Sequence, residues 1–529
     1  GFNLLIRKTW LDNSDTPHRE PVTLTLYNKK TGLPVKNAEG KNYTIELGKE
    51  EIWSSVYWIG PDSLAEDAKN LTADEVYLVE TEMGDAEVDH HYSENDEDET
   101  TSEKLPYDYL YRQRNLGEDI FDVTTENHRY QVTYSATYQN AEEDAEEEAV
   151  SLPGGVGAAF TITNRRLGNV DLTVTKDWRD GNGEGVDALQ TAMAGTGLTL
   201  AVKLEISASD DAENAFRIYD DEQGNGHVTL GGEDVPIMDN EDQPVSSVQP
   251  ILTADEEHHK IFFYNLPKYD TNGTVVRYTV EEVWLDQTGK EITLSAANYP
   301  EVYALWSTYT RSVEETSYDA NDGALENDTQ EITLTNTRTG VTDAVWYKEW
   351  HDVYMYEAGS RPDIYLDIYQ TVHTSGTETE TQLIYPSYRW TDEGLLPPET
   401  EEPDAGGDAG GSEGEVSETP AEASGDTAQQ YVWQALLEDL PKYDAYGFEI
   451  VYSAVERTNV NASEFDYAIA EYWWEGTRLG TRNEADTESE DAYTAHTTAL
   501  TGRQTEDYAK YALNLSLIHI SEPTRPLYI

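Results

Sequence analysis

The sequence predicts an all-β protein built from tandem domains. Strand-forming residues are abundant, with 36 Tyr and 12 Trp among 529 residues, and long helical patterns are scarce. A strand that alternates apolar and polar residues, at 170–180, recurs near residues 4 and 345. The copies are marked by Lys8, Lys176 and Lys348, which lie 168 and 172 residues apart. A period of that length indicates whole domains and not a solenoid of short repeats.

Composition excludes several classes of protein. The formal net charge of −69 argues against nucleic acid and anionic membranes as partners, because both require basic surfaces. The absence of cysteine excludes disulfides, thiolate catalysis and Cys-based zinc sites. No run of about 20 apolar residues is present, and no signal peptide opens the chain. We therefore expect a monomeric, internal piece of a longer protein, with no direct membrane insertion.

The first recurring element is a strand with the pattern Lys-x-Trp-x-Asp. In the copy at 170–180, Leu172, Val174 and Trp178 share one face, and Lys176 lies on that same face. The other two copies also place their lysine, Lys8 or Lys348, on the apolar face. A lysine that points into a core is costly unless a partner compensates its charge or the charge is removed.

The second element directs a carboxylate inward. The motif Leu-Pro-Lys-Tyr-Asp occurs at 266–270 and 440–444, and each copy is followed by a glycine-containing turn and a strand. Glu282 and Glu456 lie on the apolar face of those two strands. In the first repeat the match is weaker: Glu80 is our choice, and Glu82 is the alternative.

The third element closes each repeat with a strand that carries an inward asparagine. These are Asn164, in the strand at 160–165, and Asn336, in the strand at 332–337. In the third repeat Asn514 is close to the expected position but has the wrong parity, so the partner of Lys348 stays open. From residue 515 the sequence resembles a translated sequencing adapter, and we exclude 515–529 from the predicted fold as an artefactual tail.

These elements define the predicted domains as 1–168, 169–340 and 341–514. Within the third domain, 397–429 is rich in Pro, Gly, Glu, Ala and Ser, which predicts a disordered insert. The acidic segment 207–222 is expected to be a surface loop. The pairs His90-His91 and His258-His259 are also assigned to surface loops, since adjacent residues on a strand face opposite ways and chelate poorly. We therefore expect no metal and no cofactor.

Lysine, glutamate and asparagine can react together in a dry core. Burial lowers the pKa of a lysine and raises that of a glutamate, because it disfavours both charged forms. A neutral amine is a nucleophile, and a protonated carboxyl can polarise the asparagine carbonyl and move protons. Attack on the carboxamide would release ammonia and leave a Lys–Asn isopeptide bond, once per domain. The alternatives are a lysine that extends its ammonium to water and a non-covalent Lys–Glu pair.

Together, Lys-x-Trp-x-Asp, Leu-Pro-Lys-Tyr-Asp, Tyr-x-Val-x-Glu and Ile-Thr-x-Thr-Asn resemble the Cna B-type domains of Gram-positive surface adhesins and pilins. The resemblance implies tandem β-sandwiches of Ig-like or transthyretin-like topology with intramolecular Lys–Asn bonds. The implied pairs are Lys176 with Asn336, assisted by Glu282, and Lys8 with Asn164, assisted by Glu80; Lys348 and Glu456 lack an assigned asparagine.

The resemblance also implies a function. We expect a structural stalk or adhesin repeat region outside the cell, anchored to the cell wall through regions absent from this sequence. The alternative is a binding module that grips a host protein or glycan through acidic or aromatic loops. An enzyme acting on an external substrate is not expected, because no Ser/His/Asp set or paired-carboxylate cleft stands out.

Overall fold

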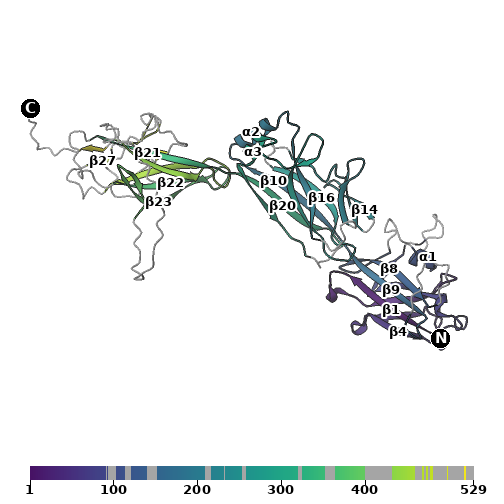
Figure 1. Ribbon diagram of the computed structural model, residues 1–529. Coiled ribbons are helices and arrows are strands. Elements are labelled where there is room, and N and C mark those ends of the chain that lie inside the picture. The colour runs from purple at the N-terminus through teal and green to yellow at the C-terminus, as the bar shows by residue number, and fades with distance from the viewer. Residues whose placement is uncertain are drawn as a thin grey trace, which may run out of the picture. The chain divides into compact units, whose positions relative to one another are not determined.

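The computed structural model describes most of the chain. The described residues are 1–90, 92, 103–112, 121–139, 152–208, 216–230, 233–252, 258–319, 325–351, 364–398 and 432–458, with short strands at 467–469, 472–474, 477–480, 497–498 and 517–519. Strands dominate, and the helices are short pieces between them (Figure 1). This confirms the predicted all-β class. No helix in the described ranges is long and apolar enough to cross a membrane.

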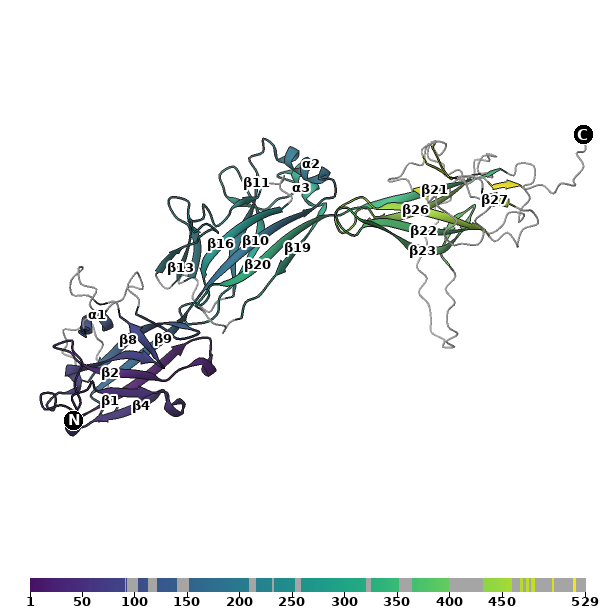
Figure 2. The same ribbon diagram turned by 180° about the vertical axis from the view of Figure 1, so that it is seen from behind.

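Two compact units make up the chain. One comprises residues 1–177, 193–295 and 312–335, and the other comprises 178–192, 296–311 and 336–529. The division runs through the second repeat, so the boundaries at 168 and 340 remain predictions. Each repeat is described below by its own sheets, which the two views in Figure 1 and Figure 2 show from opposite sides.

The first repeat forms one nine-stranded sheet in the order β3-β2-β5-β6-β7-β8-β9-β1-β4. The strands are β1 (Phe2–Leu11), β2 (Val22–Asn28), β3 (Thr44–Leu47), β4 (Ser54–Ile59), β5 (Val76–Met83), β6 (Ala86–Asp89), β7 (Asp122–Thr124), β8 (Arg129–Tyr138) and β9 (Ala158–Leu167). Between them lie η1 (Thr16–His18), η2 (Lys49–Glu51), η3 (Pro61–Ser63), η4 (Ala73–Glu75) and α1 (Tyr107–Tyr111). Leu4 and Ile6 of β1 pack into one core with Leu78 of β5 and Ile162 of β9, so the two ends of the sheet face each other.

The second repeat has sheets in the orders β16-β10-β20-β19, β15-β11-β17-β18 and β12-β13-β14. Its strands are β10 (Asn169–Arg179), β11 (Thr199–Ala208), β12 (Phe216–Asp220), β13 (Gly226–Leu230), β14 (Glu233–Pro236), β15 (Ile251–Leu252), β16 (His258–Pro267), β17 (Arg277–Leu285), β18 (Glu291–Ile292), β19 (Tyr309–Glu315) and β20 (Asp328–Arg338). Two helices join them, α2 (Glu184–Met193) and α3 (Pro300–Trp306). Every second residue of β10 from Val170 to Trp178 is buried, as the alternation predicts.

The third repeat has sheets in the orders β25-β21-β31-β27, β24-β23-β22-β26-β30 and β28-β29. Its strands are β21 (Val341–His351), β22 (Ile364–His373), β23 (Thr379–Thr391), β24 (Gly394–Leu396), β25 (Val432–Pro441), β26 (Val451–Thr458), β27 (Tyr467–Ile469), β28 (Tyr472–Trp474), β29 (Thr477–Gly480), β30 (Thr497–Thr498) and β31 (Leu517–His519). Its core includes Trp346, Trp350 and Trp390. Residues 399–429 of the predicted insert lie outside the described residues.

Three expectations are corrected by these strands. The acidic segment 207–222 contains β12, because Phe216 and Ile218 alternate and Ile218 pairs with the buried Val228 of β13. The tail excluded from the fold supplies β31, which pairs with β21. The described histidines of the two pairs do not lie in surface loops: His90 is buried, with Nε2 2.8 Å from the Tyr134 hydroxyl, and His258 and His259 belong to β16.

Candidate functional site: buried lysine–glutamate pairs

The strand that carries the lysine occupies the same place in all three repeats. It lies between an antiparallel partner and the strand that closes the repeat, in the orders β4-β1-β9, β16-β10-β20 and β25-β21-β31. The glutamate comes from strands β5, β17 and β26, which lie in the second sheet of repeats 2 and 3 and on the far side of the single sheet of repeat 1. Lysine and glutamate therefore approach each other through the core.

In the first repeat, three predicted residues meet on one carboxylate. The Lys8 Nζ donates to Glu80 Oε2 at 2.8 Å, and Asn164 Nδ2 donates to Glu80 Oε1 at 2.8 Å. The side chains of Lys8 and Glu80 are fully buried, as is Asn164. Strands β1 and β9 run parallel with Lys8 opposite Ile162 and Trp10 opposite Asn164, so the lysine and the asparagine are diagonal neighbours.

The alternative glutamate of this repeat lies elsewhere. Glu82 is exposed and stands opposite Glu87 at the end of the β5–β6 hairpin. Glu80, two residues earlier on β5, stands opposite the buried Leu24. The register with β2 shifts between these two glutamates, and this bulge turns Glu80 toward the core while Glu82 faces water. The bulge in β5 therefore decides which carboxylate reaches Lys8.

Burial favours the neutral amine in the first repeat. Desolvation lowers the pKa of Lys8 below its ordinary value, although the charge and hydrogen bond of Glu80 oppose that change. The ammonium also lies 4.7 Å from the centre of the Trp10 ring. The tryptophan of Lys-x-Trp-x-Asp thus covers the lysine nitrogen and helps to exclude water.

In the second repeat, Lys176 has no exposed side-chain surface and Nζ lies 3.1 Å from Glu282 Oε1. The same nitrogen is 3.4 Å from the carbonyl oxygen of Leu334 on β20. Asn336 follows two residues later on β20 and is fully buried. The structure thus brings Lys176 to Glu282 and buries the predicted asparagine on the strand next to β10 in the sheet order.

The third repeat contains the lysine–glutamate pair with a different residue at the asparagine position. Lys348 Nζ lies 2.9 Å from both carboxylate oxygens of Glu456, and both side chains are fully buried. Burial raises the pKa of Glu456 above its ordinary value, and the nearby lysine opposes the rise. Trp350 of β21 stands opposite Leu517, where repeat 1 has Trp10 opposite Asn164. Asn514 lies outside the described residues.

Sequence reasoning missed an arginine two residues beyond each asparagine. Arg166 Nη1 donates to Asp15 Oδ2 at 2.7 Å, and Arg338 Nη1 lies 3.3 Å from Asp180 Oδ1. Asp180, the last residue of Lys-x-Trp-x-Asp, also accepts from the backbone N–H of Val186 at 2.6 Å. Each arginine ties the end of the closing strand to the loop that follows the lysine strand. The spacing Asn-x-Arg was visible in the sequence at 164–166 and 336–338.

The Leu-Pro-Lys-Tyr-Asp motif has a structural role. The carboxylates of Asp270 and Asp444 each accept two backbone N–H groups of the turn that follows, at 2.9 to 3.1 Å. Gly273 and Gly447 close these turns with φ of 73° and 77°, a conformation that glycine adopts without strain. The motif therefore shapes the turn that leads toward the glutamate strand and contributes no reactive group.

Comparison with known proteins gives one family match. Residues 218–302 match the family model of the Cna protein B-type domain. No curated protein sequence matches the chain. The matched segment includes Glu282 and the Leu-Pro-Lys-Tyr-Asp motif at 266–270 and excludes Lys176 and Asn336.

Several solved structures are similar to the chain at low identity. The major pilin T-13 of Streptococcus pyogenes is 13% identical, covers 64% of this chain and 97% of its own, and gives a TM-score of 0.16. A B repeat unit of the collagen-binding surface protein Cna of Staphylococcus aureus is 16% identical over 64% of this chain and 98% of its own, with a TM-score of 0.14. A streptococcal ancillary pilin is 8% identical over 97% of this chain and 98% of its own, with a TM-score of 0.21.

The fold and the site define a class: tandem β-domains in which a buried lysine on the first strand meets a buried glutamate from across the core. The family match places a Cna B-type domain in the second repeat of this chain.

Proposed function

We propose that the first two repeats form intramolecular Lys–Asn isopeptide bonds, and that the chain is a structural stalk or adhesin region at a bacterial surface. The observation that carries the proposal is the buried group in repeat 1, where Glu80 bridges the Lys8 amine and the Asn164 carboxamide. In the second repeat Lys176, Glu282 and Asn336 would react in the same way.

The geometry of repeat 1 suggests how the bond forms. The neutral Lys8 Nζ attacks Cγ of Asn164, a C–N bond forms, and the bond from Cγ to Nδ2 breaks. Glu80 takes a proton from the amine through Oε2 and supplies one to the leaving nitrogen through Oε1, since those oxygens contact these two nitrogens. The products are one isopeptide bond and one ammonia, and Glu80 ends in the protonation state in which it began. The lowered pKa of Lys8 supplies the unprotonated nucleophile.

A bond at this position would join the strand that opens the repeat to the strand that closes it. Strands β1 and β9 are adjacent and parallel, so a pull on the two ends would shear them past each other. The covalent link would carry that load in place of backbone hydrogen bonds. This role, the Cna B-type match and the chain's lack of cysteine together support a stalk. Binding of a host protein or glycan remains a prediction.

Intact mass spectrometry of the full chain tests the proposal. We expect a mass two ammonias below that of the sequence, and Lys176→Ala should restore one ammonia beyond the change in side chain. The matched control is Lys36→Ala, because the exposed Lys36 Nζ contacts Asn42 Oδ1 at 2.6 Å without a buried carboxylate. Lys36→Ala should still have a mass two ammonias below that calculated from its sequence. An unmodified mass for the wild-type chain would refute the cross-links.

A further inference from the structure

A second cluster of ionisable side chains lies in the first repeat, at the end of the lysine strand. Asn13 and Ser14 turn the chain after β1 with φ of 55° and 58°, and Asp15 precedes the 3-10 helix η1, which ends at His18. His128 comes from the turn between β7 and β8. Its backbone is held there by Thr125, whose N–H and hydroxyl both donate to the His128 carbonyl, at 2.8 and 3.1 Å.

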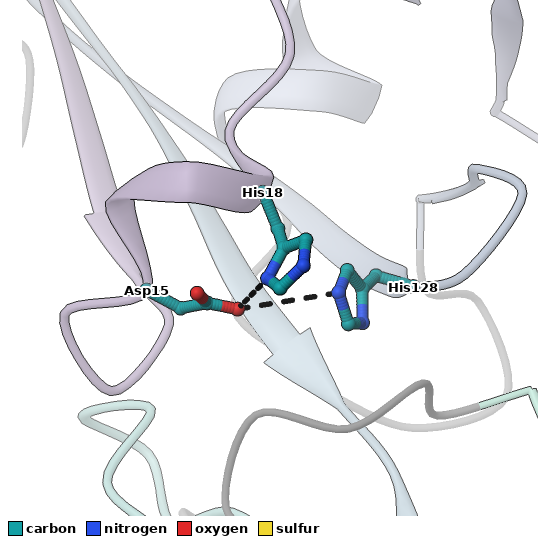
Figure 3. Close-up of side chains that lie close together, drawn as sticks. All are labelled: Asp15, His18 and His128. Carbon is teal, nitrogen blue, oxygen red and sulfur yellow. Dashed lines mark hydrogen bonds and ion pairs between the residues drawn. The ribbon is translucent and has the colours of Figure 1, made fainter.

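The three side chains converge on one point. Asp15 Oδ2 lies 2.7 Å from His18 Nδ1 and 4.0 Å from His128 Nε2 (Figure 3). One ligating atom from each residue can be chosen so that all three lie within 4.8 Å of one another. Among the described residues this is the one such group of three or more His, Asp or Glu side chains. No part of the isopeptide chemistry uses it.

His128 supplies an independent reason to look for a ligand. Its side chain is only 4% exposed, yet neither Nδ1 nor Nε2 has a hydrogen-bond partner. Leaving buried polar atoms unsatisfied is costly, so native structures rarely do so without an ion or water nearby.

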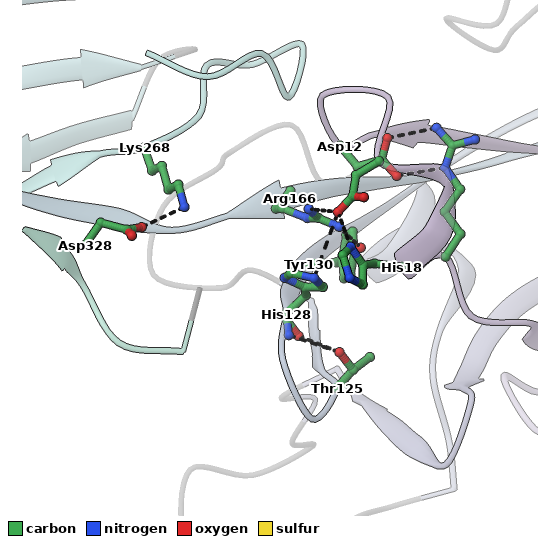
Figure 4. A network of polar contacts seen from close by, with 10 residues as sticks. Asp12, His18, Thr125, His128, Tyr130, Arg166, Lys268 and Asp328 are labelled. Carbon is green, nitrogen blue, oxygen red and sulfur yellow. Dashed lines mark hydrogen bonds and ion pairs between the residues drawn. The ribbon is translucent and has the colours of Figure 1, made fainter. Parts of the chain in front are cut away.

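We propose that Asp15, His18 and His128 bind a zinc-class divalent ion. Two imidazole nitrogens and one carboxylate oxygen are a typical three-residue ligand set for zinc, with a fourth position left for water. The His18 side chain is 48% exposed, so that position is accessible from solvent. The ion would join the loop after β1 to the β7–β8 turn, beside the network in Figure 4.

The surrounding charges make the site selective. Arg166 Nη1 donates to Asp15 Oδ2 at 2.7 Å, so the arginine orients the carboxylate as an outer partner. Its Nη2 donates to the Tyr130 hydroxyl (Figure 4). Its positive charge also opposes a second cation. Ca²⁺ and Mg²⁺ depend on several oxygen ligands, which this cluster lacks, whereas imidazole nitrogens hold Zn²⁺ strongly enough to compete.

Zn²⁺ and Co²⁺ are the probes for the full chain. The protein is first treated with a chelator and then dialysed against limiting Zn²⁺ with a large excess of Mg²⁺, which occupies the exposed carboxylates of a chain with net charge −69. We expect one tightly retained Zn²⁺ per chain by elemental analysis. With Co²⁺ we expect the intense visible absorption of a four-coordinate nitrogen–oxygen site. Retention of no ion under these conditions overturns the proposal.

Variants locate the ion. His18→Ala changes a half-exposed side chain, and it should weaken Zn²⁺ binding beyond the about 10–100-fold typical of losing an outer partner. His128→Gln should do the same. The control is His227→Ala in the second repeat, since His227 lies 3.1 Å from Asp221 and 3.3 Å from Asp234 but with no second histidine. Equal Zn²⁺ affinity in His18→Ala and wild type, or loss of the ion in His227→Ala, would show that the ion lies elsewhere.

Discussion

Replacing Glu80 by glutamine separates a covalent cross-link from a buried ion pair. Glutamine has nearly the same shape and still contacts Lys8 and Asn164, but it cannot accept the amine proton and pass one to the leaving nitrogen. We expect Glu80→Gln to fold without the bond in repeat 1. Its mass should exceed that of the wild-type chain by one ammonia, apart from the side-chain change.

Losing the Lys8–Asn164 bond should lower the free energy of unfolding of repeat 1 by a large amount. Joining Lys8 to Asn164 closes a loop of roughly 155 residues, and the chain-entropy relation for a cross-link of that length gives about 5 kcal/mol. For a domain of this size, 1 kcal/mol corresponds to about 2–4 °C, so the transition of repeat 1 should fall by about 10–20 °C. Breaking a buried ion pair alone costs about 3–5 kcal/mol, so a lowered transition temperature does not separate the two explanations.

The intact mass and a second variant distinguish the covalent cross-link from a buried ion pair. Asn164→Ala keeps the contact between Lys8 and Glu80 and removes only the carboxamide. If the bond exists, each variant falls short of the mass calculated from its own sequence by one ammonia less than the wild-type chain does. Peptide sequencing then finds Lys8 joined to Asn164 only in the wild type. Equal ammonia content in Glu80→Gln and the wild type would refute the assigned role of Glu80.

Three further predictions test the remaining repeats and the network. Leu517→Asn places a carboxamide at the register position that Asn164 holds in repeat 1, and we expect one additional ammonia to be lost on intact mass. The folded state binds the Glu456 proton more tightly than the unfolded state, so the free energy of unfolding of repeat 3 should fall as pH rises from 4.5 through the raised pKa. Urea unfolding across that pH range should show this fall in the free energy of unfolding for the wild-type chain and no such fall for Glu456→Gln. A difference in free energy between wild type and Glu456→Gln that does not change with pH would contradict the prediction. Arg166→Gln leaves the buried Asp15 without its cation and should cost about 3–5 kcal/mol in urea unfolding, against less than about 0.5 kcal/mol for the exposed Arg7→Gln.

The alternation of apolar and polar residues predicted much of the fold and part of the lysine–glutamate site. The alternation in β10 placed Lys176 on the buried face, because side chains on a strand change sides at every residue. Parity could not choose between Glu80 and Glu82, since residues two apart share a face in a regular strand. The choice depends on a bulge in the pairing of β5 with β2, which breaks the alternation between the two glutamates and cannot be predicted from local sequence.

Contacts between distant segments explain what the sequence could not show. His18 and His128 share no local pattern, and they meet only because the β7–β8 turn reaches the loop after β1. The β12 strand was hidden among acidic residues, since Arg217 and Asp220 are exposed and only its pairing with β13 reveals the alternation. Local sequence predicts which face of a strand is buried, but not which faces meet.

The free-energy cost of burying a lysine–glutamate pair is itself an argument that the pair forms a covalent bond. A buried ion pair is often no more stable than apolar residues of similar volume, and replacing one can stabilise a protein by about 1–4 kcal/mol. This chain nevertheless buries a lysine against a glutamate in all three repeats, at Lys8, Lys176 and Lys348. If the pair served only stability, the double variant Lys8→Met with Glu80→Leu should match or exceed the wild type in urea unfolding. If it serves to make a bond, that variant should fold, retain one ammonia, and unfold with the lower stability expected of an uncrosslinked repeat. A double variant as stable as the wild type would leave the buried pair in repeat 1 without a covalent purpose.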